Sequence, residues 1–170
     1  MNEQSALSSL NPSIPQSLVD GGKRDGSLRF VVFRLGKQGY ALPLEQVELA
    51  LRMVSVAQVP DAPPGVIGVI DLHGQVISVM DLRQRFNQPD RKPHPDDRLL
   101  VVTIQEQTLA LLVDKVSQVL EVTKEQIEFP PEPLPQGGKI MGMIRQEEGL
   151  IMILDTNRLL EKNTDEKQSG

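Results

Sequence analysis

The chain contains an internal repeat, and this repeat constrains its fold more than any other feature. Residues 30–51 align without a gap on residues 99–120, and residues 66–86 align in the same way on residues 140–160. In both alignments apolar residues fall opposite apolar residues, so the positions that build a hydrophobic core are the ones duplicated. The sequence therefore predicts one small unit that is used twice.

Each copy has the pattern of two β-hairpins. In the first copy, apolar runs at 30–35 and 40–44 are joined by a Gly-containing turn, and a second pair at 66–70 and 76–80 flanks another such turn. The second copy repeats these hairpins at 99–104 with 109–113 and at 140–144 with 150–154. The second copy also holds extra residues at 129–135, where a surface loop tolerates an insertion at low cost.

A short helix is predicted between the two hairpins of the first copy. Leu44, Val47 and Leu51 fall on one face at helical spacing, which leaves Leu49 pointing elsewhere. An exposed Leu49 is either a lone surface side chain or part of a contact patch, and the sequence leaves both interpretations open.

The expected architecture is all-β, with two stacked barrels of about five strands each. The strands at 66–70 and 76–80 are apolar at nearly every position, which predicts that both of their faces are covered. Two independent units of about 60 residues would be marginally stable, so the units are expected to share a core. We expect tails at 1–27 and 161–170 and a domain at 28–160. Within the domain, units at 28–86 and 97–160 are expected to be joined by a Pro-containing linker at 87–96.

Composition excludes several classes of protein. The 170 residues carry 18 basic and 23 acidic side chains, for a formal charge of −5, with no Trp and one Tyr, so a basic or aromatic surface for nucleic acid is not expected. The absence of Cys removes disulfides and thiol nucleophiles. No apolar run approaches the roughly 20 residues that span a bilayer, and no signal-peptide pattern is present, which favours a cytoplasmic protein without membrane insertion.

The chain offers few residues for catalysis or metal binding. His73 has Asp71 nearby, but a solvated turn is favoured over a His–Asp pair, and His94 in the linker is a weaker candidate. Asp81 and Asp155 stand at equivalent places before short helical segments, so helix capping explains both better than a catalytic carboxylate pair does. No metal-ligand spacing and no cofactor-binding motif occurs. We therefore expect no enzyme activity, no metal and no cofactor.

Four segments together resemble the CheW-like chemotaxis coupling proteins. They are FVVFRLG from Phe30, GVIDLHGQVISVMDLR from Gly68, LLVDKVSQVL from Leu111 and ILDT from Ile153. The resemblance covers residues 28–160. It implies two five-stranded SH3-like barrels with short helical turns, packed on a shared hydrophobic core, and no catalytic activity.

The resemblance also implies a function. Members of the family are adaptors that link the cytoplasmic tips of chemoreceptors to the regulatory domain of the histidine kinase CheA, in membrane-associated arrays where self-association also occurs. Carried over by position, Val47 and Gly68 match places that face the kinase. Leu49, His73 and Val119 match places on or near the receptor-facing surface.

Two of these positions depart from the family pattern. The family usually has an acidic residue where Leu49 stands and Arg where His73 stands, so both changes remove a charge from the expected contact surface. His cannot reproduce the planar guanidinium that holds a carboxylate with two hydrogen bonds. An alternative is therefore a divergent scaffold of a non-chemotactic receptor–kinase pathway, such as one controlling surface motility.

The two copies differ most in one pair of loops. Residues 71–74, with the sequence DLHG, align on residues 145–148, with the sequence RQEE, although the strands on either side match. The core was kept alike while the exposed loops diverged. Functional differences between the copies are expected in these loops.

Overall fold

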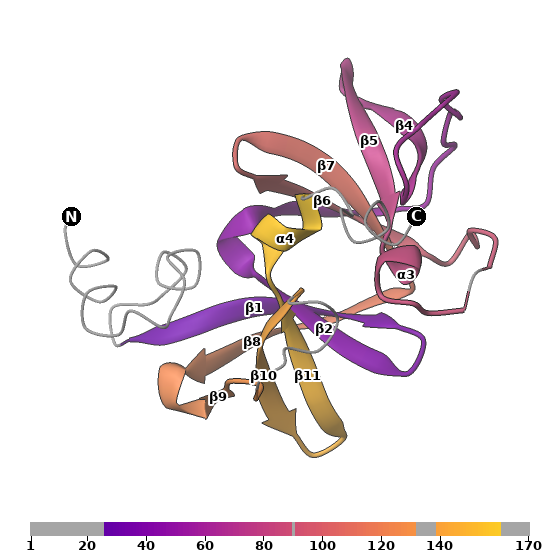
Figure 1. The fold of residues 1–170 in the computed structure, drawn as a ribbon. Helices are drawn as coiled ribbons and strands as arrows, with labels where there is room; N and C mark the ends of the chain where they lie inside the picture. Colours follow the sequence, from indigo (N-terminus) through magenta and orange to yellow (C-terminus); the bar gives the residue numbers. More distant parts are fainter. Residues whose placement is uncertain (1–25, 90, 132–138, 161–170) are drawn as a thin grey trace.

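The computed structural model describes residues 26–89, 91–131 and 139–160, which form two β-sheets (Figure 1). The predicted tails lie outside the described residues except for Gly26 and Ser27, as does most of the predicted loop insertion. The strands are β1 (Ser27–Leu35), β2 (Gln38–Pro43), β3 (Val47–Arg52), β4 (Val66–Leu72), β5 (Gln75–Asp81), β6 (Arg98–Ile104), β7 (Gln107–Val113), β8 (Lys115–Thr123), β9 (Ile127–Glu128), β10 (Ile140–Gln146) and β11 (Gly149–Leu154). The helices are α3 (Leu82–Arg85) and α4 (Thr156–Leu160), with 3₁₀ turns η1 (Leu44–Gln46) and η2 (Lys124–Gln126).

The sequence repeat is also a repeat of structure. Strands β1, β2, β3, β4 and β5 and helix α3 correspond to β6, β7, β8, β10, β11 and α4, because the aligned residues fall in these elements. Asp81 caps α3 as predicted, since its carboxylate accepts a hydrogen bond from the backbone N–H of Arg83 at 3.0 Å. None of the helices in the described ranges is long and apolar enough to cross a membrane.

Each SH3-like barrel contains strands from both copies, so the prediction that each repeat forms its own barrel is wrong. One sheet has the order β3-β6-β7-β5-β4, and the other has the order β8-β1-β2-β11-β10-β9. We call them the five-stranded and the six-stranded barrel. The first hairpin of each copy is inserted into the barrel of the other copy, where β2 pairs in parallel with β11 and β7 pairs in parallel with β5.

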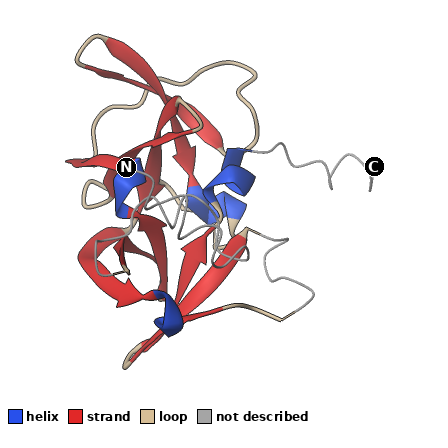
Figure 2. Ribbon diagram, turned by 90° about the vertical axis from the view of Figure 1, so that its left-hand side faces the viewer, coloured by secondary structure: helices blue, strands red, loops and turns tan. Residues whose placement is uncertain are grey.

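The exchanged hairpins explain how the core is shared. Along β1, Val31 and Phe33 face a cluster with members in both barrels, whereas Phe30 and Val32 face a cluster built only from strands of the six-stranded barrel. Only a strand that lies between the two barrels can bury both of its faces in this way. The two barrels, which lie one above the other in Figure 2, therefore depend on each other for burial, as the small size of each unit predicted.

The second hairpins do not have both faces covered, contrary to the prediction. Burial alternates along β4, β5, β10 and β11, and Val76 on β5 is 69% exposed. The doubly covered strands are instead those of the first hairpins, β1, β2, β6 and β7. An apolar run alone did not distinguish a central strand from an outer one.

The predicted helix at 44–51 is mostly a strand. Only η1 is helical, and from Val47 onward the chain pairs with β6, with Leu51 opposite Leu99. Strand pairing overrides the helical spacing of Leu44, Val47 and Leu51, because Val47 and Leu51 fit a period of two as well. As a result Leu49 lies on the same face as Val47 and Leu51, and it packs against the shared cluster instead of pointing away from it.

Candidate functional site

Val47 and Leu49 lie side by side on one face of β3, an edge strand of the five-stranded barrel. Both side chains are partly buried and pack against the cluster shared by the two barrels. A partner can therefore touch only part of each side chain. Substitution at either position will change packing as well as any contact with a partner.

Gly68 lies on β4, the other edge strand of the same sheet. Its φ is +155°, and a Cβ built there would stand 2.3 Å from the carbonyl oxygen of Ala57 and 2.6 Å from Cγ1 of Val56. The neighbouring residue Val69 exchanges two backbone hydrogen bonds of 2.8 Å with Ala57. Gly68 is thus needed where the chain segment around Ala57 crosses β4 at close range.

His73 lies in the exposed turn between β4 and β5, at the end of the hairpin that projects away from the six-stranded barrel in Figure 1. Its φ is +53°, an uncommon conformation for a residue other than Gly. The carboxylate of Asp71 accepts a hydrogen bond from the Gly74 N–H at 2.9 Å, which holds the turn. This geometry agrees with the predicted turn, in which the carboxylate of Asp71 binds a backbone N–H group.

Val119 lies on β8, an edge strand of the six-stranded barrel, and is 56% exposed. The predicted receptor residues are therefore divided between the two barrels, with Leu49 and His73 on one and Val119 on the other. Large apolar side chains that are exposed elsewhere in the described ranges are Val54, Val59, Val76 and Phe129. Exposed apolar side chains of this kind are typical of protein contacts when they gather into patches.

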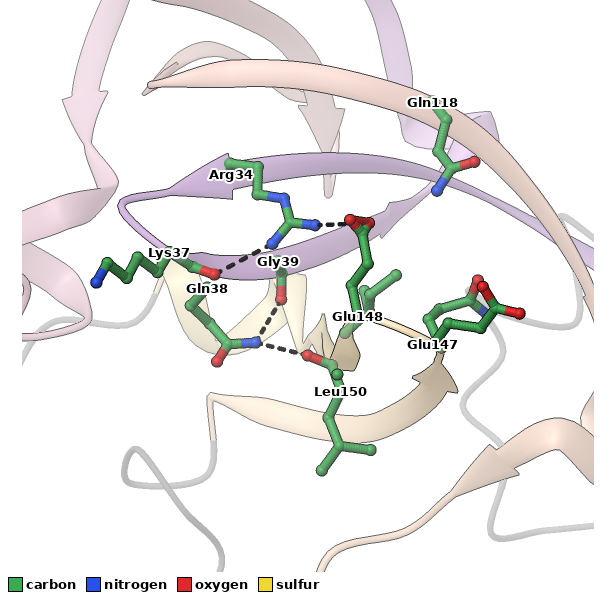
Figure 3. A pocket seen from close by; sticks show the side chains of 11 residues that line it. Arg34, Lys37, Gln38, Gly39, Gln118, Glu147, Glu148 and Leu150 are labelled. Atoms are coloured by element: carbon green, nitrogen blue, oxygen red, sulfur yellow. Dashed lines mark hydrogen bonds and ion pairs between the residues drawn. The ribbon is translucent and has the colours of Figure 1, made fainter.

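One pocket of about 410 Å³ is built from the turns β1–β2 and β10–β11, with Gln118 of β8 at its side (Figure 3). Its polar groups are largely satisfied internally. Arg34 donates to the carbonyl of Lys37 at 3.1 Å and forms an ion pair of 3.6 Å with Glu148, and Gln38 donates to the carbonyl of Leu150 at 2.7 Å. The loop at 145–148, which differs between the two copies, thus supplies one wall of this pocket. This is the loop in which the sequence predicted a functional difference between the copies.

A second, more open pocket of about 540 Å³ lies beside Gly68. Val56 and Ile67 form an apolar wall, and Arg91, Lys92 and Pro93 of the inter-repeat segment also line it. No pattern in the sequence predicted this pocket, because the pocket depends on the segment after β3 and the segment after α3 lying close together. Neither pocket is lined by Val47, Leu49, His73 or Val119.

In the described ranges no group of three or more His, Asp or Glu side chains is placed to hold a metal ion. The exposed His94 accepts a hydrogen bond at Nδ1 from the backbone N–H of Asp96 at 3.0 Å, within the linker. Among the exposed large apolar side chains of the described residues, Val76 and Val119 are the most exposed, at 69% and 56%.

The comparisons with known proteins agree with the fold described above. The family model of the CheW-like domain matches residues 29–164. The chain belongs to the CheW-like domain family. It is 29% identical to the chemotaxis protein CheW of Bacillus subtilis (strain 168) over 138 residues, which are 80% of this chain and 88% of the relative.

Further relatives support the same assignment. The chain is 28% identical to the chemotaxis protein CheW of Helicobacter pylori over 137 residues, which are 80% of this chain and 83% of the relative. The crystal structure of the scaffolding protein TtCheW from Thermoanaerobacter tengcongensis matches with a TM-score of 0.74 and 31% identity. That match covers 80% of this chain and 94% of the CheW structure, so both CheW barrels are represented.

Proposed function

We propose that this protein is a non-enzymatic signalling adaptor that couples chemoreceptors to the histidine kinase CheA by binding both. The match over 80% of the chain to a structure described as a scaffolding protein carries the proposal, at a TM-score of 0.74. The adaptor would act in the cytoplasm at membrane-associated receptor arrays, where it would also associate with its own kind.

The regulatory domain of CheA is assigned to the five-stranded barrel, whose two edge strands carry Val47 on β3 and Gly68 on β4. Two observations support this assignment. The pocket beside Gly68 has an apolar wall of Val56 and Ile67, and the segment after β3 exposes Val54 and Val59 by 46% and 41%. Such apolar surface is suited to a protein interface of ordinary size.

The receptor tip is assigned to Leu49, His73 and Val119. Val119 supports this assignment best, because a valine that is 56% exposed on an edge strand can be buried by a helix of the receptor. His73 adds an exposed polar group at the tip of its hairpin. Leu49 contributes the part of its side chain that the core leaves accessible.

Mapping by NMR tests the receptor side. Adding a receptor-tip peptide to the labelled protein should shift the resonances of residues around Val119, and Val119→Asp should remove this response. The matched control is Val59→Asp, which introduces the same charge at an exposed valine of the segment after β3, outside the proposed receptor contact. No footprint in the wild-type protein, or an equal loss of response in both variants, would contradict the proposed receptor site.

A divergent scaffold of a non-chemotactic pathway is the second candidate, favoured by Leu49 and His73. The double variant Leu49→Glu, His73→Arg restores the charges that the family pattern has at these places. If the divergence sets partner choice, the variant should bind its own receptor more weakly and a chemoreceptor tip more strongly. Unchanged binding to its own receptor would eliminate this second candidate, provided that thermal unfolding shows the variant to be folded.

A further inference from the structure

Five charged side chains meet where the two barrels touch. Three of them, Asp81, Arg83 and Asp97, are each only 2% exposed. We call the group the Arg83 cluster, and its members are Asp81, Arg83, Arg91, Asp97 and Asp114. Buried charges of this kind are uncommon unless they are paired.

The two guanidinium groups hold the three carboxylates together. Arg83 donates a hydrogen bond to Asp114 and lies 3.5 Å from a carboxylate oxygen of Asp81 and 3.8 Å from one of Asp97. Arg91 donates to both carboxylate oxygens of Asp97, at 2.6 and 3.2 Å, and to Asp114 at 3.0 Å. The inter-repeat segment is therefore anchored to the cluster.

The cluster connects elements of both barrels. Asp114 stands between β7 of the five-stranded barrel and β8 of the six-stranded barrel. Its other carboxylate oxygen accepts from the N–H of Gly36, in the β1–β2 turn, at 2.7 Å, and its own N–H donates to the carbonyl of Arg34 at 3.0 Å. Arg83 belongs to α3, which follows β5 of the five-stranded barrel. The ion pair from Arg83 to Asp114 thus crosses from one barrel to the other.

The repeat supplies an internal comparison for this junction. Gln105 aligns with Gly36, and Asn157 aligns with Arg83, so the two residues occupy the equivalent place at the opposite junction. There, Nε2 of Gln105 donates to Oδ1 of Asn157 at 2.9 Å, in an exposed hydrogen bond between neutral groups. One junction is joined by a buried network of charges, and the other by a hydrogen bond open to solvent.

These observations point to a role in orientation. The apolar core shared by the barrels attracts without direction, so it resists separation more than it resists sliding or rotation. The planar guanidinium of an arginine donates its hydrogen bonds only in a narrow range of directions. Replacing a buried ion pair by apolar groups is often neutral for net stability, so its retention fits specificity of structure better than added stability.

We propose that Arg83 is a positioning residue that fixes the angle between the two barrels. As a consequence that rests on the proposed function, it holds the kinase-facing side of the five-stranded barrel in a constant relation to Val119 on the six-stranded barrel. A receptor movement is then passed to the kinase without being absorbed by rotation between the barrels. At the opposite junction Asn157 stands in the place of Arg83, and its hydrogen bond with Gln105 is exposed and joins neutral groups.

Distance measurements between the barrels test the proposal. The chain has no cysteine, so Ser78→Cys on β5 and Glu147→Cys in the β10–β11 turn provide unique sites for spin labels on exposed positions of different barrels. Pulsed electron–electron double resonance should give one narrow distribution of distances between the two spin labels in the otherwise wild-type chain. Arg83→Met should broaden or shift it, whereas Asn157→Leu, the matched change at the opposite junction, should not.

Two further measurements separate orientation from folding and from partner binding. Asp97→Asn keeps the shape of the cluster and should also broaden the distribution, so the test remains decisive if Arg83→Met fails to fold. The isolated CheA regulatory domain should bind the folded variants with wild-type affinity, while the response of the kinase to receptor in the ternary complex is lost. An unchanged distribution in Asp97→Asn and in any folded Arg83→Met protein would overturn the proposal. Since the distances are measured without partners, failure of the proposed function alone would leave this result intact.

Discussion

The two barrels have the same strand order but are completed by different segments. In the six-stranded barrel a two-residue strand, β9, pairs with β10, and it is preceded by the capping box of η2. In the five-stranded barrel the equivalent segment makes only the single bridge between Ala57 and Val69. Gly68 and Gly142 lie at matching places beneath these segments.

The difference shows which part of the repeat was free to change. The inner strands β1, β2, β6 and β7 are buried in both copies, since each is needed by both barrels. The completing segments and the hairpin turns contact fewer residues, and they carry the exposed apolar side chains Val54, Val59 and Phe129. A shared core with different outer segments lets one duplicated unit present two different surfaces.

The two junctions between the barrels should differ most in stability. Removing Arg83 takes a cation away from the buried Asp81 and leaves Arg91 as the cation at the buried Asp97, and breaking a buried ion pair in this way costs about 3 to 5 kcal/mol. We expect Arg83→Met to lower the free energy of unfolding by about this amount, and Asn157→Ala by less than about 1 kcal/mol, because its hydrogen bond is exposed. Urea unfolding of the two variants measures the difference, and equal losses would refute the asymmetry of the junctions.

The paired glycines should differ by a smaller amount. A Cβ at Gly68 meets the backbone oxygen of Ala57, which cannot move independently, so Gly68→Ala should cost about 1 to 3 kcal/mol. At Gly142 the nearest atom is Cγ2 of Ile127 at 2.9 Å, which is a side-chain methyl group at a longer distance instead of a backbone oxygen. Gly142→Ala should therefore cost clearly less in the same urea assay. A larger loss at Gly142 would contradict this prediction, because it would show that a side chain is tolerated less beneath β9 than beneath the segment around Ala57.

Acid should affect the buried cluster more than an exposed ion pair. Burial alone would raise the pKa of Asp97, but hydrogen bonds from Arg91 and the His94 N–H, with the charges of Arg91 and Arg83, bring this pKa below its ordinary value. Asp97 therefore stabilises the fold above the pKa that it has in the unfolded chain, and this contribution is lost as the pH falls through the lower pKa of the folded state. Between pH 5 and 3 the wild-type protein should lose stability more steeply than Asp97→Asn.

The exposed pair of Glu128 and Arg145 provides the control for this experiment. The hydrogen bond from Arg145 lowers the pKa of Glu128 as well, but both groups are open to solvent. Glu128→Gln should therefore leave the acid profile close to that of the wild-type protein. Stability measured across the same pH range gives both comparisons, and a flatter profile in Glu128→Gln than in Asp97→Asn would contradict them.

The smallest effect on stability is expected at Val119. Its side chain is more than half exposed, so Val119→Ser should change the free energy of unfolding by no more than about 0.5 kcal/mol. Binding to the receptor tip should nevertheless weaken. Thermal unfolding and titration with a receptor-tip peptide together measure the two effects. A large loss of stability would assign Val119 to the fold instead of to a contact.

Local patterns in the sequence predicted most of the strands. The duplicated apolar positions placed both hairpins of each copy, and the place of Asp81 before a helical turn predicted its cap. The exchange of hairpins was not predictable in this way, because the parallel pairing of β2 with β11 joins residues more than a hundred positions apart. Periodicity also failed at 47–52, where the same apolar residues satisfy both a helical and a strand spacing.

The candidate site was predicted less completely than the fold. The resemblance singled out Val119 and His73, which are exposed, but it could not show that Leu49 packs inward or that Gly68 lies beneath a crossing segment. The Arg83 cluster escaped prediction for a physical reason. Charged residues in a sequence indicate solvent exposure by default, and only tertiary structure shows which of them are buried together.

Simultaneous binding of both partners tests the central claim most directly. Analytical ultracentrifugation of the protein with the CheA regulatory domain and a receptor-tip fragment should show a ternary complex for the wild-type chain. Val119→Asp should retain the complex with the CheA domain and lose the receptor fragment, because Val119 lies on the six-stranded barrel, whereas Val47 and Gly68 lie on the five-stranded barrel. Competition between the two partners for the wild-type protein, or loss of both partners in Val119→Asp, would contradict an adaptor with separate surfaces.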